Sequence, residues 1–298
     1  MEFTKYNPFV ILIYFGCNIL ITMLTKNPVI IGISIFSSSV YTLLLMKPKK
    51  IKKVILIIVI VILIASITNP LFNSNGEIIL FKIGKKEFSL EAIIYGMVAS
   101  IMLIAIVIWL FSFNHLMTTE KFLHLFSKYL PNLALIIANI LKLIPEFTRK
   151  INSLNESEKI LSFSYENGII GRLKSKFKLF GNLFSWAIEN SIITASSMKA
   201  RGYGLKGKTN YSIYKFIFKD LIMSLIFIAV TIFIIIYGSN ILFNYSFYPN
   251  LTPLDFSLKP SITYITYTLF ANYASLNLVK EKIKWHYLNS KIHPSPMH

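Results

Sequence analysis

The sequence predicts an all-α, polytopic membrane protein with about six transmembrane helices and a set of amphipathic cytoplasmic helices. Its 298 residues are 54% hydrophobic and 15% charged, whereas soluble domains carry about 25% charged residues. Several apolar runs also approach the length of about 20 residues that a helix needs to cross a hydrocarbon core of about 30 Å. Composition and run length together place most of the chain in a bilayer.

Six apolar runs are predicted as membrane spans, and none of them contains Asp, Glu, Lys, Arg or His. The third run is short, and Asn69-Pro70-Leu71-Phe72 extends it. The predicted organisation is four transmembrane helices in residues 1–113, cytoplasmic helices in 114–215, and two transmembrane helices with a basic cytoplasmic tail in 216–298. In chain order the six runs are Phe9–Thr25, Pro28–Met46, Val54–Thr68, Ala92–Phe113, Leu221–Phe243 and Ser261–Val279.

The distribution of Lys and Arg predicts the orientation, because short cytoplasmic loops carry an excess of these residues. The loop KPKKIKK, Lys47 to Lys53, follows the second span, and residues 114–215 hold fifteen Lys and Arg against six Glu. Both features predict a protein of the cell membrane with its N- and C-termini in the cytoplasm. The outer loop near Lys82 and Lys86 fits this rule less well.

The chain is strongly basic, with 31 Lys and Arg against 13 Asp and Glu and a formal net charge of +18. In a membrane protein, a basic surface of this size favours anionic lipid or an acidic protein partner over nucleic acid. The single cysteine, Cys17, can form no disulfide within the chain.

The spans lack the groups that membrane-embedded chemistry requires. Ion-coupled transporters usually keep an ionisable residue at membrane depth, and intramembrane hydrolases need a nucleophile with a base, or metal ligands. We therefore expect no catalytic residue, no metal site and no cofactor. The histidines all lie outside the spans, and none is paired at metal-ligand spacing: His115, His124, His286, His293 and His298.

Apolar residues recur at helical spacing within the basic segment 114–215. Two interpretations remain open: helices that lie on the bilayer with Lys and Arg toward the headgroups, or a platform that docks a second protein. Periodicity does not separate them. The three apolar stripes are Phe122, Leu125, Phe126 and Tyr129; Leu133, Ile136, Ile137, Ile140, Leu141, Ile144 and Phe147; and Leu173, Phe177, Phe180, Leu183, Phe184, Ala187, Ile188, Ile192 and Met198.

The stretch GYGLKGKT, Gly202 to Thr209, matches the phosphate-loop pattern G-x-x-x-x-G-K-[ST]. A working phosphate loop lies between a buried strand and a helix N-terminus, where backbone N–H groups converge on the phosphates. Here a helical pattern from Trp186 to Arg201 comes first, so the stretch begins at a helix C-terminus, where the dipole is negative. We interpret the match as accidental and predict no nucleotide binding there.

The same helix end has a second property. Ala200-Arg201-Gly202 places a cation in the last turn and a glycine at the C′ position, where many helices end. An Arg at the tip of a helix can cap a carbonyl, or it can enter an acidic, aromatic groove on a partner.

At this helix end the chain resembles the transmembrane T component of energy-coupling factor transporters, which are ATP-driven importers of vitamins and metal ions. Members of that family carry an Ala-Arg-Gly triplet at the end of a coupling helix. Other resembling elements occur in the family's order, from about the second span to Lys215. They are Asn69-Pro70-Leu71-Phe72 followed by Gly76, Leu90-Glu91-Ala92 with Tyr95-Gly96, and the basic-x-x-Pro element Leu141-Lys142-Leu143-Ile144-Pro145.

The resemblance implies that residues 114–215 hold coupling helices, that two cytoplasmic ATPase subunits dock on them, and that their movement reaches a membrane-embedded substrate-binding subunit. The chain itself would bind neither ATP nor substrate and would not be an enzyme. The family commonly has a second Arg triplet, but its place, Leu161–Gly168, reads LSFSYENG without Arg. The implied ATPase contacts are Met198, Lys199, Ala200, Arg201 and Gly202, with Lys142, Pro145, Arg149 and Arg172 as further candidates.

Two other functions remain open. A permease subunit with its own substrate path would need polar residues along the spans; the candidates are Asn18, Ser34, Ser37–Ser39, Thr42 and Asn272. An integral-membrane transferase would need a carboxylate or His site near the interface. Its candidate carboxylates, Glu120, Glu146, Glu189 and Asp220, show no catalytic spacing.

Overall fold

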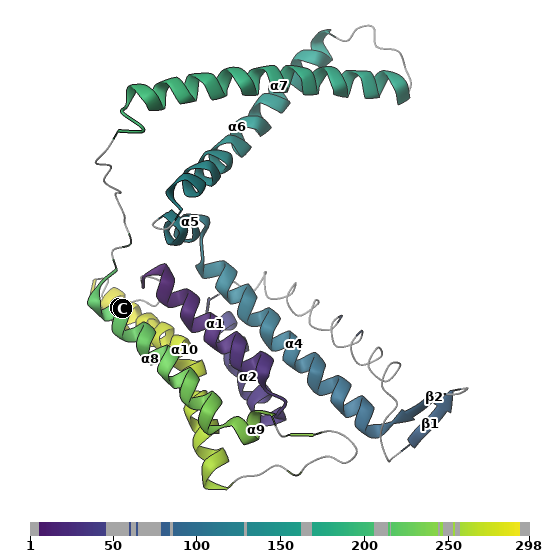
Figure 1. The fold of residues 1–298 in the computed structure, drawn as a ribbon, viewed down its shortest axis with the longest axis vertical. Coiled ribbons are helices and arrows are strands. Elements are labelled where there is room, and N and C mark those ends of the chain that lie inside the picture. The colour runs from purple at the N-terminus through teal and green to yellow at the C-terminus, as the bar shows by residue number, and fades with distance from the viewer. Residues whose placement is uncertain are drawn as a thin grey trace, which may run out of the picture. The chain divides into compact units, whose positions relative to one another are not determined.

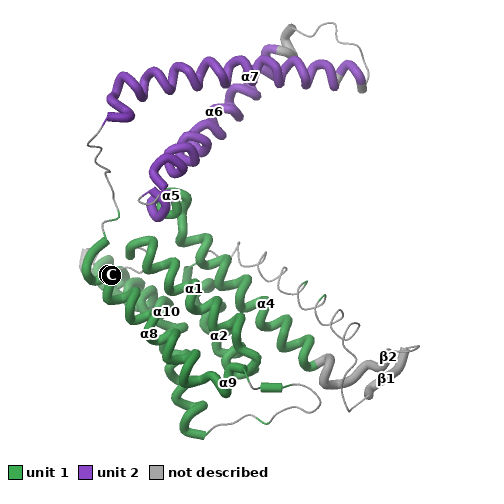
Figure 2. Tube along the Cα trace, in the orientation of Figure 1, with its two compact units in different colours: residues 1–122, 214–298 green, residues 123–213 purple. Residues whose placement is uncertain are grey.

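The structure is a computed structural model in which the chain forms two compact units (Figure 2). Unit 1 comprises Met1–Phe122 and Tyr214–His298, and unit 2 comprises Leu123–Ile213. The structure describes residues 6–45, 60, 64, 79–83, 86–127, 130–161, 169–205, 214, 216–243, 245–246, 253 and 257–292.

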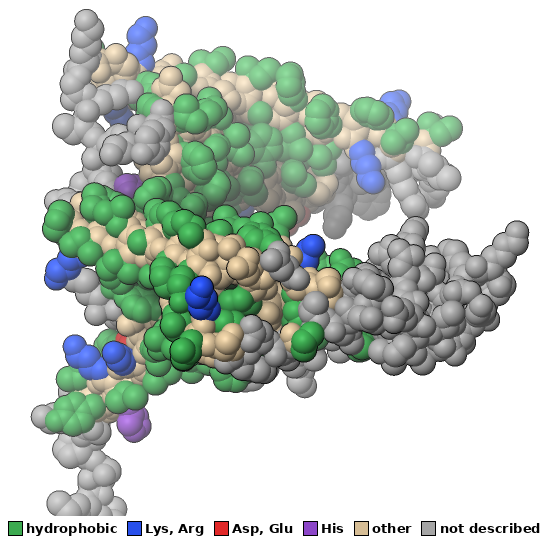
Figure 3. All heavy atoms as spheres, turned by 60° about the horizontal axis from the view of Figure 1, so that its bottom comes forward, with side chains coloured by type: hydrophobic (Ala, Val, Ile, Leu, Met, Phe, Trp, Pro, Cys, Tyr) green, Lys and Arg blue, Asp and Glu red, His purple; other side chains and the backbone are tan. Residues whose placement is uncertain are grey.

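Unit 1 is a bundle of apolar helices (Figure 1). Helix α1 packs against α2, α4 and α8, and α10 packs against α2 and α8. The bounds are α1 (Pro8–Leu24), α2 (Pro28–Leu45), α4 (Leu90–Leu116), α8 (Phe218–Tyr237), the short α9 (Ser239–Phe243) and α10 (Leu258–Ile292). Hydrophobic side chains cover much of the face seen in Figure 3, as expected for a surface in contact with lipid.

The predicted all-helical membrane architecture is confirmed. Among the described residues, three helical stretches are long and apolar enough to cross a membrane: Pro28–Leu45, Ile94–Leu116 and Phe218–Tyr237. The shorter apolar helix α1 covers the first predicted span, and α10 covers the sixth. Apart from Ile60 and Ile64, both helical, the third predicted span, Val54–Thr68, lies outside the described residues.

The fifth predicted span was wrong at its end, because α8 stops at Tyr237 and does not continue to Phe243. Gly238 follows α8 and lies so close to α10 that an added Cβ would meet Thr263 Cγ2 at 2.8 Å and the Ile234 carbonyl oxygen at 2.6 Å. The absence of a side chain therefore permits this close approach. An apolar run alone does not reveal it, since Ile241 and Leu242 continue the hydrophobic pattern.

A β-hairpin occupies part of the predicted outer loop. Strand β1 (Ile79–Ile83) pairs antiparallel with β2 (Lys86–Ser89), and Lys82 lies opposite Glu87 in the register. Apolar and polar residues alternate in Phe81-Lys82-Ile83 before Gly84 and in Glu87-Phe88-Ser89 after it, which is a hairpin signal. A search for apolar runs of membrane length does not detect strands this short.

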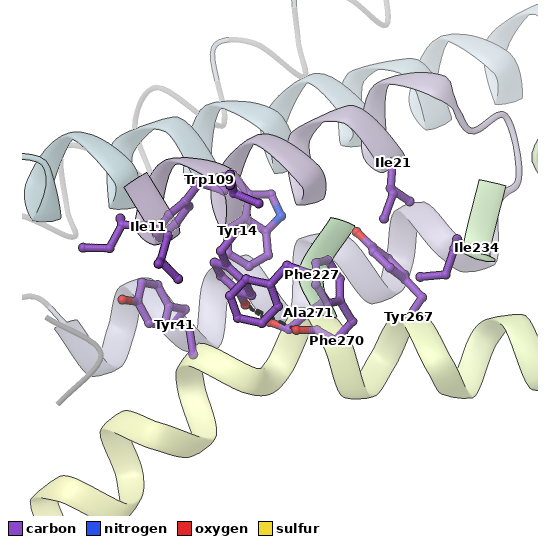
Figure 4. Packing of buried hydrophobic residues seen from close by; sticks show 14 of the residues in the cluster. Ile11, Tyr14, Ile21, Tyr41, Trp109, Phe227, Ile234, Tyr267, Phe270 and Ala271 are labelled. Carbon is purple, nitrogen blue, oxygen red and sulfur yellow. Dashed lines mark hydrogen bonds between the residues drawn. The ribbon is translucent and has the colours of Figure 1, made fainter. Parts of the chain in front are cut away.

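The core of unit 1 is an aromatic cluster around Tyr14 of α1 (Figure 4). The Tyr14 ring lies 6.1 Å from Trp109 of α4, 5.3 Å from Phe227 of α8 and 5.6 Å from Phe270 of α10, measured between ring centroids. Its hydroxyl donates to the carbonyl of Ala271 at 2.7 Å. One fully buried side chain thus contacts three neighbouring helices.

Buried hydroxyl groups join the same helices. The Thr22 hydroxyl lies 2.7 Å from that of Ser34 on α2 and 3.3 Å from that of Tyr267 on α10, and the Trp109 indole donates to Ser34 at 3.1 Å. Thr42 and Ser112 form a second pair, at 2.7 Å, between α2 and α4. Such bonds fix how helices pack in lipid, where burial of apolar surface does not distinguish a neighbouring helix from lipid.

Unit 2 consists mainly of two long helices, α6 (Pro131–Leu161) and α7 (Ile169–Ala200), and α5 (Thr119–Ser127) precedes them. Helix α6 begins at Pro131, whose missing N–H costs nothing in a first turn. The two helices meet where Phe147 packs edge-on against Trp186, with ring centroids 5.3 Å apart, and Lys150 Nζ lies 5.9 Å from the Trp186 ring. Whether these helices are cytoplasmic, as the domain boundaries 114–215 imply, stays a prediction.

Replacing Tyr14 by Phe should lower the free energy of unfolding in detergent by about 1 kcal/mol, because an interhelical hydrogen bond within a membrane bundle contributes about that much. The matched control is Thr266→Val, since the hydroxyl of the half-buried Thr266 donates within its own helix, α10, to the Ile262 carbonyl. Unfolding in sodium dodecyl sulfate, followed by circular dichroism, measures both. Equal midpoints for Tyr14→Phe and wild type would contradict the role of this hydroxyl.

Candidate docking site

The end of α7 is closed by backbone hydrogen bonds alone. The N–H of Tyr203 donates to the carbonyl of Met198 at 2.9 Å, and the N–H of Gly202 donates to that of Lys199 at 3.0 Å. This pair of bonds is a Schellman motif, and it requires a left-handed residue at C′. Gly202 supplies it with φ of 80°, so the predicted glycine termination of this helix is confirmed.

A turn follows immediately. The Leu205 N–H donates to the Gly202 carbonyl at 3.2 Å, and Gly204 takes a second positive φ, of 103°. The first four residues of the phosphate-loop pattern therefore lie at the carbonyl end of a helix, which disfavours an anion. The rest of the pattern, residues 206–209, lies outside the described residues, and the absence of nucleotide binding stays a prediction.

The triplet side chains are available to a partner. Lys199, Ala200 and Arg201 are exposed, and Met198 is half-buried. Within the described part of the chain, the Arg201 guanidinium has no hydrogen-bond or ion-pair partner. The backbone has already closed the helix, so this cation is not needed as a cap.

An apolar stripe runs along one exposed face of α7. Its members recur every three or four residues, so they share one face, and each is roughly half or more exposed. Phe180 and Phe184 stack with ring centroids 6.4 Å apart. This α7 stripe consists of Leu173, Phe177, Phe180, Phe184, Ile188 and Ile192. A contiguous exposed apolar surface of this kind marks a site for protein or lipid.

Helix α6 carries an equivalent surface. The predicted apolar stripe is largely exposed, at Leu133, Ile136, Ile137, Ile140 and Ile144. The contact between Phe147 and Trp186 therefore covers one part of the two helices and leaves both stripes uncovered within the described residues.

The basic candidates on α6 share another face. Lys142, Pro145 and Arg149 follow at spacings of three and four, and all are exposed. Arg149 Nε donates to the Pro145 carbonyl at 3.4 Å. Arg172 lies near the start of α7, far along the helix from Arg201. Apart from the helical backbone of Leu161, the expected place of the first Arg triplet, Leu161–Gly168, lies outside the described residues.

Polar residues of the spans hold helices together. Asn272 Nδ2 donates to Ser37 Oγ at 2.9 Å, between α10 and α2, whereas Asn18 Nδ2 donates within α1, to the Tyr14 carbonyl at 2.8 Å. Ser34 and Thr42 belong to the hydroxyl pairs of the core. These bonds give the polar residues a packing role that needs no substrate path.

The candidate carboxylates of a transferase do not gather. Asp220 is buried at the start of α8, where Oδ2 accepts from the Ile217 N–H at 3.1 Å. This carboxylate closes a helix N-terminus. Glu120 and Glu189 are exposed on different helices. Among the described residues, no three His, Cys, Asp or Glu lie close enough together to hold a metal ion.

Replacing Gly202 by Ala should open the end of α7, because a left-handed backbone is strained by about 1–2 kcal/mol for a residue with a Cβ. The new Cβ would also lie 3.1 Å from Leu205 Cδ1. We expect hydrogen exchange at the amides of Gly202 and Tyr203 to accelerate about tenfold. Gly181→Ala is the control, since its Cβ meets no atom within 4 Å and α7 continues through it. Unchanged exchange in Gly202→Ala would contradict the motif.

Comparison with known proteins gives one family match. The family described as "Cobalt transport protein" (CbiQ) matches residues 4–211, which include α1, α2, α4, α5, α6, α7 and the triplet at the end of α7. No curated protein matches the chain.

Proposed function

Because this chain belongs to the CbiQ family of cobalt transport proteins, the transmembrane T component of energy-coupling factor transporters, we propose that it transmits conformational change from two cytoplasmic ATPase subunits to a membrane-embedded substrate-binding subunit. Membership of the family makes the chain a membrane transport component and not an enzyme. The proposed cargo is a vitamin or metal ion, which the substrate-binding subunit would select. This chain would supply neither the ATP site nor the substrate site.

The observation that carries the proposal is the Arg201 side chain at the tip of α7. It is exposed, and the helix end is complete without it. An exposed guanidinium matches an acidic or aromatic groove, because it donates from a planar fork and stacks on rings. We assign the contact with one ATPase subunit to Met198, Lys199, Ala200, Arg201 and Gly202. The candidates for the contact with the other subunit are Lys142, Pro145, Arg149 and Arg172.

The apolar stripes support protein docking over simple lipid contact. The α7 stripe ends at Ile192, about two and a half turns before Arg201, so one partner can cover both. The helix carries aromatic residues at the centre of the stripe, and aromatic residues and Arg dominate the energetics of protein interfaces.

The proposed orientation places both termini and unit 2 in the cytoplasm, with the protein in the cell membrane. Support comes from the basic loop Lys47–Lys53 and the excess of Lys and Arg in residues 114–215. The ATPases are then on the side of the membrane where ATP is available.

Arg201→Ala should reduce co-purification of the ATPase subunits by well over tenfold, because truncation of a central interfacial Arg commonly costs about 2 kcal/mol or more. Lys178→Ala is the matched control: Lys178 is an exposed cation on α7, away from its tip. Quantitative mass spectrometry of tagged chain, purified from detergent-solubilised membranes, measures the bound subunits. Full recovery of both ATPases with Arg201→Ala would refute the assignment of Arg201.

Phe180→Glu places a charge in the middle of the α7 stripe, which weakens an apolar interface with either protein or lipid. Measuring ATPase recovery and vesicle binding of the same variant therefore separates docking from lipid contact. The control is Asn182→Glu, which puts the same charge about 200° away around the helix, at an exposed position. We expect Phe180→Glu to lower ATPase recovery at least tenfold and Asn182→Glu to leave it unchanged. Normal recovery in Phe180→Glu, with weaker binding of the purified chain to anionic vesicles, would instead identify the stripe as a lipid-facing surface.

A further inference from the structure

The chain passes from unit 1 to unit 2 after Phe122 and returns to unit 1 at Tyr214. Lys121 precedes the first crossing and Tyr214 follows the second, so both belong to unit 1. Their side chains meet: Lys121 Nζ lies 6.0 Å from the centroid of the Tyr214 ring. A cation at this distance over a ring face is attracted by the quadrupole of the ring.

Lys121 is also fixed to the end of α4. Its ammonium donates to the carbonyl of Leu116, the last residue of α4, at 3.2 Å. The residue is 8% exposed, and burial lowers the pKa of its ammonium from the ordinary value. The carbonyl end of a 27-residue helix and the Tyr214 ring offset this loss of hydration.

Tyr214 is in turn tied to the start of α1. Asn7 Nδ2 donates to the Tyr214 carbonyl at 3.4 Å, while Asn7 Oδ1 accepts from the N–H of Phe9 at 3.0 Å and caps α1. Phe9 also packs edge-on against Phe216, with ring centroids 6.2 Å apart. The contacts therefore run from the end of α4, through both crossings, to the start of α1.

We propose that Lys121 and Tyr214 are positioning residues that clamp the two crossings together and deliver movement of unit 2 to α1 and α4. The proposal rests on the function proposed above, in which the ATPases drive that movement. The first crossing is held by α4 and the second by α1, so a clamp between them makes both helices respond to one displacement. Loss of this contact should weaken the coupling between the two crossings.

A second lysine provides a comparison with simple helix capping. Lys282 Nζ donates to the carbonyl of Leu44, near the end of α2, at 2.6 Å. Lys121 and Lys282 thus make the same kind of bond to the carbonyl end of a span, but Lys282 is on α10 and remote in sequence from both crossings. Loss of a cap and loss of the clamp can therefore be measured separately.

The test uses distances between two spin labels in the full chain in lipid nanodiscs, with Cys17 replaced by Ser. One label is at Met23→Cys, 69% exposed on α1, and the other is at Glu189→Cys, exposed on α7 and away from the α7 stripe. Distances are recorded for the chain alone, and for its complex with the ATPases before and after addition of Mg²⁺–ATP. The variants are Lys121→Met, Tyr214→Leu, Tyr214→Phe and Lys282→Met.

In wild type we expect one population of distances that shifts with Mg²⁺–ATP. Lys121→Met and Tyr214→Leu should each broaden the distances in the chain alone. They should also reduce, by up to about tenfold, the fraction of molecules whose distance changes when Mg²⁺–ATP is added. A tenfold change corresponds to a cation–π contact of ~1.4 kcal/mol. Recovery of the ATPases should be unchanged, which separates this effect from docking. Tyr214→Phe keeps the ring, and Lys282→Met keeps the clamp, so both should behave as wild type.

Two results would contradict the proposal that Lys121 and Tyr214 act as a clamp. If Tyr214→Leu behaves as wild type while Lys121→Met does not, Lys121 only caps α4. If Lys282→Met broadens the distances as much as Lys121→Met, general loosening of unit 1 explains the effect. Should wild type bind no ATPase, the proposed function fails, but the distances in the chain alone still decide whether the clamp exists.

Discussion

The packing of unit 1 depends on polar contacts made inside an apolar bundle. In lipid, a leucine gains little by exchanging an acyl chain for a neighbouring helix, so shape and hydrogen bonds decide which helices pair. The hydrogen bond from the Tyr14 hydroxyl to the Ala271 carbonyl joins α1 to α10. The hydroxyl of Thr22 on α1 lies within hydrogen-bond distance of Ser34 on α2 and of Tyr267 on α10. These contacts fix how α1 packs against α2 and α10, and the indole of Trp109, which donates to Ser34, adds α4 to the same network.

The sequence was sufficient for features that depend on composition or on neighbouring residues. Charge-free apolar runs predicted the three helices that are long enough to cross a membrane, and Arg201-Gly202 predicted the end of α7, because a left-handed glycine at C′ is a local requirement. The break at Gly238 was not predicted, since its cause is the approach of Thr263 from a helix later in the chain. The contact of Lys121 with Tyr214 was missed for the same reason: it joins residues that are distant in sequence.

Unit 2 differs from unit 1 in how its apolar residues are used. In unit 1 the aromatic residues at the centre of the core, Trp109 and Tyr14 among them, are fully buried. In unit 2, Phe177 and Phe180 of α7 are 69% and 66% exposed, and the packing of α6 on α7 leaves them uncovered. Apolar exposure of this extent is typical of a surface that contacts another molecule. Unit 2 thus consists mainly of two long helices whose apolar stripes stay exposed among the described residues, as the proposed docking requires.

Backbone hydrogen bonds complete the C-terminal end of α7, and this affects how the sequence of such a protein can change during evolution. Main-chain atoms of Met198, Lys199, Gly202 and Tyr203 complete the helix end, and the glycine is the one position there with a backbone requirement. Side chains at 199–201 therefore carry little of the folding free energy. These three positions can therefore change without unfolding the helix, and under the proposed docking selection on them acts through the partner. Partner choice can then evolve separately from the fold that presents it.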